Sequence, residues 1–325
     1  MGQILCIEDD KAKFIQSDSI PEAEGKEAYL WANLTCLAEK MESAEEKQKI
    51  EENSNGALQS LRDFYTSSAY ALTGAVIDAQ GLSTPFVVFR GDTDENVKDD
   101  AQRLLMLDTP TSTFRTTKGT TVGEAVTEFI VKYEELKNTG LVKWAVQSAK
   151  LSNRGLSITG HGIGGALANL LAVELLVDYG IEFPVRLRTY GAPRLFTAMT
   201  SRSIRSLEVY NKMSFTRYVN DNDIFPSLPP RTQKLAHIGT TSKYDKASNI
   251  WRIGKFPDIA IQPNHSLAPH FFEGEVGYIN HFRKVIFVLY VVCKCVYLCL
   301  LILVYRPCCY FYCYNTLLIS PFFVH

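Results

Sequence analysis

The sequence predicts an α/β fold in which a mostly parallel β-sheet carries helices on both faces. Three observations lead to this prediction. Short segments with strand character lie at residues 85–89, 156–159, 185–190 and 215–220, helical patterns separate most of them, and glycine-containing or acidic turns end them. Short strands that alternate with helices are typical of parallel sheets, because the crossover helices cover both faces of such a sheet.

The helices that this pattern predicts lie between the strands. Helical spacing of apolar residues occupies about 95–106 and 122–150, and a strongly apolar helix follows the second strand at 164–179. In open parallel sheets the reactive groups lie on loops that leave the carboxyl ends of the strands. Reactive groups are therefore expected where each predicted strand ends.

The composition divides the chain into three parts. Residues 1–68 are a predicted helical N-terminal segment, polar overall, with apolar side chains at helical spacing between Leu30 and Met41. Residues 69–284 are expected to form the α/β domain. Residues 285–325 are an apolar C-terminal tail that holds six of the eight cysteines.

The tail is long enough to cross a bilayer. Residues 285–305 are 21 predominantly apolar residues, and a span needs about 20. Lys294 at the centre costs roughly 2.5–3.5 kcal/mol on insertion, which the aliphatic residues around it offset. Its richness in Phe, Tyr and Cys and its lack of acidic residues also favour a rival interpretation, a segment that is not native to the domain. We expect a membrane-associated or cytoplasmic protein.

Charge and cysteine usage exclude several classes of protein. A net charge of -1 provides no basic surface for nucleic acid, so no nucleic-acid partner is expected. Residues 7–26 are charged and have no apolar core, so no secretory signal is seen. Cys6 and Cys36 are the only cysteines before the tail, which favours a reducing compartment. No metal site and no cofactor are expected.

The most informative segment is the turn Gly160-His161-Gly162-Ile163-Gly164, which connects the run at 156–159 to the apolar helix. A strand that turns into a helix through small residues at the first and fifth positions forms a nucleophile elbow. The middle residue of an elbow has a strained backbone and would present the attacking side chain. Here that residue is Gly162, which has no side chain. Glycine should preserve the turn while its chemistry is lost.

Five segments together resemble a known family. The turn and the Gly165-Ala166-Leu167-Ala168 that follows it are similar to the elbow of the class 3 (fungal-type) lipases, which have an α/β-hydrolase fold. The other segments come in the order of that family: Phe89-Arg90-Gly91, Thr189-Tyr190-Gly191-Ala192-Pro193-Arg194, Asn222-Asp223-Ile224-Phe225-Pro226 and Leu228-Pro229-Pro230. A single GxGxG is weak evidence, whereas this ordered set is specific. The resemblance covers about residues 69–284.

The resemblance implies a triad from which one member is missing. Gly162 stands at the position of the serine, and Asp223 matches the aspartate that would orient a histidine. His265 best matches the context of that histidine, with His270 second and His281 third. A retained Asp–His pair could also be a structural hydrogen bond.

The resemblance places the oxyanion donors at Asp92 and Ile163. The family usually has Ser or Thr where this chain has Asp92. A carboxylate aimed at the oxyanion would repel the developing charge, and the alternative is that Asp92 turns to solvent within an acidic loop. In either arrangement the hydroxyl donor is absent. Of the other histidines, we expect His161 to pack beside the turn and His237 to lie on the surface.

The sequence is compatible with three functions. The first is a lipase homologue that is catalytically impaired or inactive and binds lipid, acyl ester or a partner protein. The second is an active acylglycerol or carboxylic ester hydrolase with an unconventional nucleophile, or with water activated by His265 and Asp223. The third is an interaction protein tethered to a membrane through residues 285–305. The absence of the nucleophile and of the hydroxyl donor favours the first.

Overall fold

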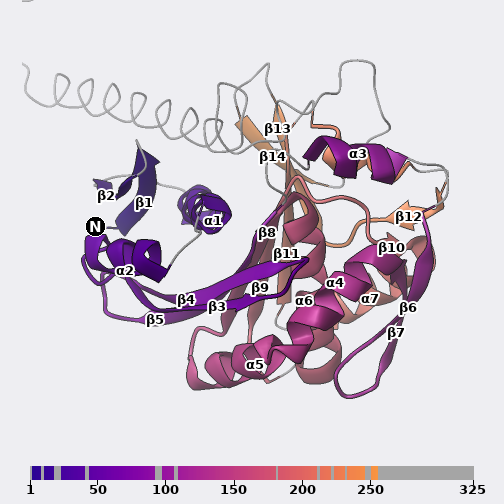
Figure 1. The fold of residues 1–325 in the computed structure, drawn as a ribbon, viewed down its shortest axis with the longest axis horizontal. Coiled ribbons are helices and arrows are strands. Elements are labelled where there is room, and N and C mark those ends of the chain that lie inside the picture. Colours follow the sequence, from indigo (N-terminus) through magenta and orange to yellow (C-terminus); the bar gives the residue numbers. More distant parts are fainter. Residues whose placement is uncertain are drawn as a thin grey trace, which may run out of the picture.

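The computed structural model describes residues 2–8, 11–17, 23–40, 44–91, 97–105, 109–180, 182–210, 213–220, 223–230, 233–245 and 250–254. The large sheet in this part of the chain has eight strands in the order β14-β13-β11-β9-β8-β5-β4-β3 (Figure 1). Their bounds are β3 Leu58–Tyr65, β4 Tyr70–Ile77, β5 Ser83–Phe89, β8 Leu156–His161, β9 Val185–Tyr190, β11 Met213–Val219, β13 Thr240–Asp245 and β14 Ile250–Gly254.

The middle of this sheet is parallel. Strands β5, β8, β9, β11 and β13 pair in parallel with their neighbours, whereas β3, β4 and β14 join the two edges in antiparallel pairs. The predicted runs at 85–89, 156–159, 185–190 and 215–220 are β5, β8, β9 and β11. The predicted mostly parallel α/β sheet is therefore confirmed.

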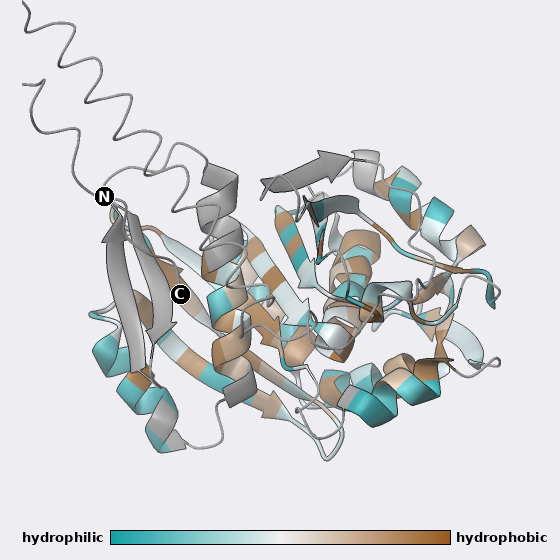
Figure 2. Ribbon diagram, turned by 90° about the horizontal axis from the view of Figure 1, so that it is seen from above, coloured by the Kyte–Doolittle hydropathy of each residue, from teal (hydrophilic) through white to brown (hydrophobic). Residues whose placement is uncertain are grey.

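Helices cover both faces of the sheet, as the sequence predicts (Figure 1). Helix α6 (Gly162–Tyr179) packs on β5, β8 and β9, and α4 (Thr127–Asn138) and α5 (Leu141–Leu151) lie on the same side. Alternate side chains such as Ile158 and Leu187 join that core, while Phe86 and Val88 face α1 (Ala23–Lys40) on the other side. The banding of apolar and polar residues along the strands and helices is visible in Figure 2.

Helix α1 is attached to its face of the sheet by apolar and polar contacts. Trp31 packs edge-on against Phe86 with 6.1 Å between ring centroids. The buried hydroxyls of Thr35 and Thr159 lie 3.0 Å apart and share a hydrogen bond. The latter residue is on β8, three positions before Gly162, so α1 supports the strand that leads into the elbow.

The N-terminal segment is helical over a shorter range than residues 1–68. Helices α1 and α2 (Ala44–Asn53) are present, but β1 (Gly2–Glu8) and β2 (Lys11–Ser17) precede them as an antiparallel hairpin. The stretch 58–65 is strand β3, which pairs with β4 and so belongs to the large sheet. Polar side chains alternate irregularly with apolar ones along β3, because it is an exposed edge strand. The sequence pattern therefore did not identify it as a strand.

The predicted helix at 122–150 is three elements. Residues 121–126 form β7 (Thr121–Val126), and α4 and α5 follow it. Gly140 separates the two helices at φ +94°, a conformation that favours glycine. Strand β7 belongs to a four-stranded sheet with β6 (Thr111–Arg115), β10 (Phe196–Thr197) and β12 (Leu235–Ala236). Helices α3 (Val97–Leu105) and α7 (Ala198–Tyr210) complete the elements used below.

Helix α6 is long and apolar enough to span a membrane by composition alone. Among the described residues it is the one helix of this kind, and 83% of its apolar window is buried inside the protein. That burial identifies α6 as the core helix of the α/β domain. The predicted span at 285–305 lies outside the described residues.

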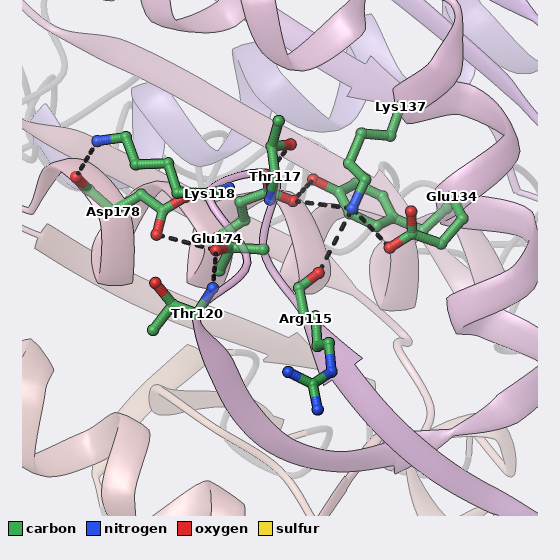
Figure 3. A network of polar contacts seen from close by, with 10 residues as sticks. Arg115, Thr117, Lys118, Thr120, Glu134, Lys137, Glu174 and Asp178 are labelled. Carbon is green, nitrogen blue, oxygen red and sulfur yellow. Dashed lines mark hydrogen bonds and ion pairs between the residues drawn. The ribbon is translucent and has the colours of Figure 1, made fainter.

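A fully buried carboxylate connects α6 to the β6–β7 turn. Glu174 accepts hydrogen bonds from the backbone N–H of Thr117 at 2.7 Å, from the hydroxyl of that threonine, and from the phenol of Tyr133 at 2.8 Å (Figure 3). Burial and then the neighbouring carboxylate raise the pKa of Tyr133 well above its ordinary value, so its phenol remains a donor. The Lys137 ammonium lies 4.0 Å from the same carboxylate and supplies the nearby positive charge.

We expect Glu174→Leu to destabilise the fold. The substitution leaves the buried Tyr133 phenol without an acceptor, at a cost of about 1–3 kcal/mol, whereas the exposed Thr117 can donate to water instead. Urea unfolding followed by circular dichroism measures the loss. The matched control is Glu182→Leu, because this glutamate is partly exposed in its pair with Lys150 and such pairs contribute about 0–1 kcal/mol. Equal stability of the two variants would contradict the structural role of Glu174.

Candidate active site

The predicted elbow is a sharp connection between β8 and α6. His161 has an extended backbone at φ -116° and ψ 146°, and Gly162, the first residue of α6, has φ +51°. A residue with a side chain at such a φ costs roughly 1–2 kcal/mol, whereas glycine adopts it freely. The strand–turn–helix geometry of a nucleophile elbow is thus present, and its tip carries no side chain.

Three other glycines allow α6 to approach the strands. A Cβ atom built on Gly160 would overlap the carbonyl oxygen of Gly164, and one on Gly164 would lie 2.5 Å from the carbonyl oxygen of Arg90. A Cβ atom on Gly165 would lie 2.7 Å from the Cβ atom of Ala192. Real Cβ atoms essentially never show contacts under 3.0 Å, and two of these three contacts are with backbone. The glycines at 160 and 164 are therefore required by packing.

The strand register brings the predicted oxyanion segment beside the elbow. Phe89 on β5 pairs in parallel with Gly160 on β8, so Arg90 and Gly91 leave the sheet next to the turn. The backbone N–H of Ile163 lies in the first turn of α6, where N–H groups have no partner within the helix and the helix dipole is positive. That position suits a backbone donor to an oxyanion. Asp92 lies outside the described residues.

Asp223 lies on the same edge of the sheet. His161 pairs with Tyr190 and Tyr190 pairs with Tyr218, so β8, β9 and β11 end side by side, and Asp223 follows β11. Two strand spacings separate β8 from β11, roughly 10 Å. The Asp223 carboxylate is fully buried, and its Oδ1 accepts a hydrogen bond from the backbone N–H of Phe225 at 2.9 Å. The carboxylate thus binds the first N–H of the short 3-10 helix η1 (Phe225–Ser227), although the N-cap residue itself is Ile224.

Arg194 holds the loop behind Asp223, a role that the sequence did not indicate. Its guanidinium is fully buried, and Nη1 donates to the carbonyl oxygens of Ser227 and, at 2.6 Å, Pro229. Its backbone N–H donates to the Leu228 carbonyl, also at 2.6 Å. Two segments that the sequence singled out, the one ending at Arg194 and the Leu-Pro-Pro at 228–230, are thus joined by hydrogen bonds.

His237 is buried, so the expectation of a surface histidine is wrong. Its side chain lies between apolar neighbours, since Leu235 and Ile238 are also buried, and Nε2 is 2.8 Å from the Pro226 carbonyl oxygen. Burial, and then the Arg217 and Arg194 guanidiniums, lower the pKa of His237 well below its ordinary value. The apolar residues on both sides were the local signal for burial. His161 is also buried, in agreement with a packing role.

The remaining residues of the predicted triad, His265 and its alternatives His270 and His281, lie outside the described residues. Within the described residues no three His, Cys, Asp or Glu side chains gather as a metal site would require.

Comparisons with known proteins point to one family. Residues 86–233 match the model of the family described as Lipase (class 3). The chain is 30% identical over 129 residues to Lipase ZK262.3 of Caenorhabditis elegans, and 26% identical over 178 residues to the Rhizomucor miehei lipase. These alignments cover 35% and 54% of this chain, and 35% and 46% of the relatives. The matches thus span less than half of either relative.

Solved structures agree with the sequence comparisons. The Rhizomucor miehei triacylglyceride lipase superposes with a TM-score of 0.54 at 20% identity, over 70% of this chain and 83% of that one. Lipase II from Rhizopus niveus superposes with a TM-score of 0.57 at 18% identity, over 77% and 93%. At these identities the likeness shows the fold, which is α/β-hydrolase-like.

We expect Gly164→Ala to destabilise the protein more than Gly119→Ala. The added methyl of the first would meet backbone carbonyls of Phe89 and Arg90 that cannot turn aside, and overpacking of this kind typically costs 1–3 kcal/mol or more in addition to local distortion. The second is strained at φ +84° but faces open space, so it should lose only about 1–2 kcal/mol. Thermal unfolding of both variants measures the difference, and an equal loss would show that α6 can move away from the sheet.

Proposed function

Because this chain belongs to the fungal-type class 3 lipase family, we propose that it is a lipase homologue that binds lipid or acyl ester without hydrolysing it. One observation carries this proposal. The residue at the tip of the elbow is Gly162, and every other feature of the turn is retained around it. Nucleophilic acyl transfer requires a side-chain oxygen or sulfur at that tip, so the first chemical step has no attacking group.

The nearest hydroxyls do not replace the serine. Ser157 and Thr159 lie on β8 and are almost fully buried, with side chains toward α1 and away from the tip of the turn. Thr159 is hydrogen-bonded to Thr35 there. Neither can approach an ester bound at the carboxyl edge without unfolding the strand, which supports loss of hydrolysis rather than a substitute nucleophile.

What the elbow retains is a binding device. The N–H groups at the start of α6, Ile163 among them, attract an oxygen that carries partial or full negative charge. An ester carbonyl and a fatty carboxylate both have such an oxygen, and the family implies a lipid or ester ligand. The ligand class that we propose is therefore a long-chain acyl ester or fatty acid, held with its carboxyl end at Gly162.

We also propose that the chain attaches to membranes through residues 285–305. The support is the run of 21 predominantly apolar residues with Arg283 and Lys284 before it and Arg306 after it. We expect the full-length chain to sediment with membranes and to resist extraction at high salt. A chain that lacks residues 285–325 should be found in the supernatant. Recovery of both chains in the supernatant would contradict the attachment.

The central test is restoration of the nucleophile by Gly162→Ser. We expect the native chain to hydrolyse p-nitrophenyl esters at the rate of buffer and to resist labelling by a fluorophosphonate. The serine variant should gain on the order of hundredfold or more in rate, since a triad nucleophile contributes far more than that in intact enzymes. Gly162→Ala is the matched control, because it introduces the same strain at φ +51° without the hydroxyl.

Each result has a distinct meaning. Activity in the serine variant alone shows that Asp223, a histidine and the groove are intact and that only the nucleophile was lost. Activity in the native chain overturns the proposal and supports the alternative, an ester hydrolase with an unconventional nucleophile or with directly activated water. Inactivity of all three chains leaves acyl binding as the function to measure, by displacement of a fluorescent fatty acid. Absence of binding there would refute the proposal.

A further inference from the structure

The segment that carries Asp223 is attached to the body of the protein from two sides. On one side Arg194 donates to the carbonyls of Ser227 and Pro229. On the other side Nε2 of His237 donates a hydrogen bond to the carbonyl of Pro226. In the sequence, Pro226 lies between Asp223 and the residues whose carbonyls Arg194 binds. Asp223 accepts the N–H of Phe225, the residue directly before Pro226, so the positions of Pro226 and of that carboxylate are coupled.

His237 is in turn fixed by helix α7. Its carbonyl oxygen accepts hydrogen bonds from the Ser201 hydroxyl at 2.6 Å and from Nη2 of Arg205 at 2.9 Å. A continuous chain of contacts thus runs from α7 through His237 and Pro226 to η1 and Asp223. Arg194 supports the far end of the same loop independently.

The surroundings of His237 are unfavourable to a positive charge. Arg217 of β11, Arg194 of the loop after β9 and Arg205 of α7 all act on the imidazole, and burial removes the water that would solvate an imidazolium. The Pro226 carbonyl can only accept, so Nε2 carries the hydrogen and a further proton would go to Nδ1. That proton would place a fourth cation beside the three guanidiniums.

We propose that neutral His237 is the positioning residue of the Asp223 segment, and that acidification releases it. The protonated ring is accommodated only when it leaves its buried site, which breaks the contact with Pro226 and frees the segment to open. This pH-dependent release concerns the position of Asp223 and not the chemistry at Gly162. It therefore does not depend on whether the chain hydrolyses esters.

The direction and size of the effect follow from proton linkage. The pKa of His237 is depressed in the closed segment and ordinary, about 6.5, once the ring is exposed. The neutral ring therefore stabilises the closed segment fully above about pH 6.5, and this contribution falls as the pH drops toward the depressed value. For one proton, the opening equilibrium should rise about tenfold between pH 7.5 and 5.5.

Hydrogen exchange of the full-length chain tests this directly. Exchange rates are corrected for the intrinsic effect of pH, and peptides that cover residues 223–230 are compared with peptides from β8 and β9. We expect protection of 223–230 to fall about tenfold between pH 7.5 and 5.5 while the central strands change little. No selective loss of protection in this segment would overturn the proposal.

Substitutions assign the effect to the histidine. His237→Gln and His237→Asn retain an N–H donor and cannot titrate, so in either variant the ratio of protection between the two pH values should be close to one. Ser201→Ala is the matched control. It removes the 2.6 Å hydrogen bond to the His237 carbonyl but leaves the imidazole, so the tenfold ratio of protection between the two pH values should persist. A tenfold ratio in the glutamine or asparagine variant would show that another group titrates and would refute the role of His237.

Discussion

The close approach of helix α6 to the ends of β5 and β8 is the contact on which the rest of the structure depends. Gly160 and Gly164 have no room for a methyl group, because backbone atoms occupy the space on both sides. This approach starts α6 immediately after β8 and keeps it buried along almost its whole length. The helix then presents Glu174 to the β6–β7 turn, so a second, smaller sheet is positioned from the same helix.

The same constraint makes the elbow compatible with a tip residue that has no side chain. The glycines that set the turn are distinct from the residue at its tip, so the backbone geometry does not rely on what stands at position 162. A serine there would have to adopt φ near +51°, a strained conformation for any residue with a side chain. Gly162 relieves that strain. In our proposal the protein has exchanged a reactive side chain for a relaxed turn and retains the N–H groups that would bind an acyl oxygen.

Asp223, which the family resemblance matches to a catalytic aspartate, has a structural role of its own in this fold. Its carboxylate binds the first N–H of η1, and η1 lies in a loop held by the buried Arg194 and by His237. Replacing the aspartate would leave the Phe225 N–H buried without its acceptor, a loss of about 1–3 kcal/mol that is independent of any reaction. The segment Gly191-Ala192-Pro193-Arg194 also has a structural role, because the Arg194 side chain holds the loop in which η1 lies.

Local sequence determined the central strands β5, β8, β9 and β11 and the nature of the elbow. The segment at 185–190 coincides with β9 because Pro184 and Gly191 bound a short stretch in which Val185 and Leu187 alternate with arginines, a pattern that local sequence alone identifies as a strand. The glycine cluster predicted the tight turn, and Gly162 is the residue from which we predict the absence of a nucleophile. The order of five short segments predicted the family, and Asp223 followed from the same match.

Tertiary structure decided the features that depend on contacts between distant residues. Strand β3 has many polar residues, and β4 supplies its backbone partners. Strand β7 lies next to a helical pattern in the sequence, and β6 and β10 supply its backbone partners. His237 is buried because α7 and the loop after β11 close over it, and Arg194 acts on carbonyls more than 30 residues away. A local pattern reports the preference of a segment, whereas burial, pairing and the charge around a side chain are set by whichever segments the fold places against it.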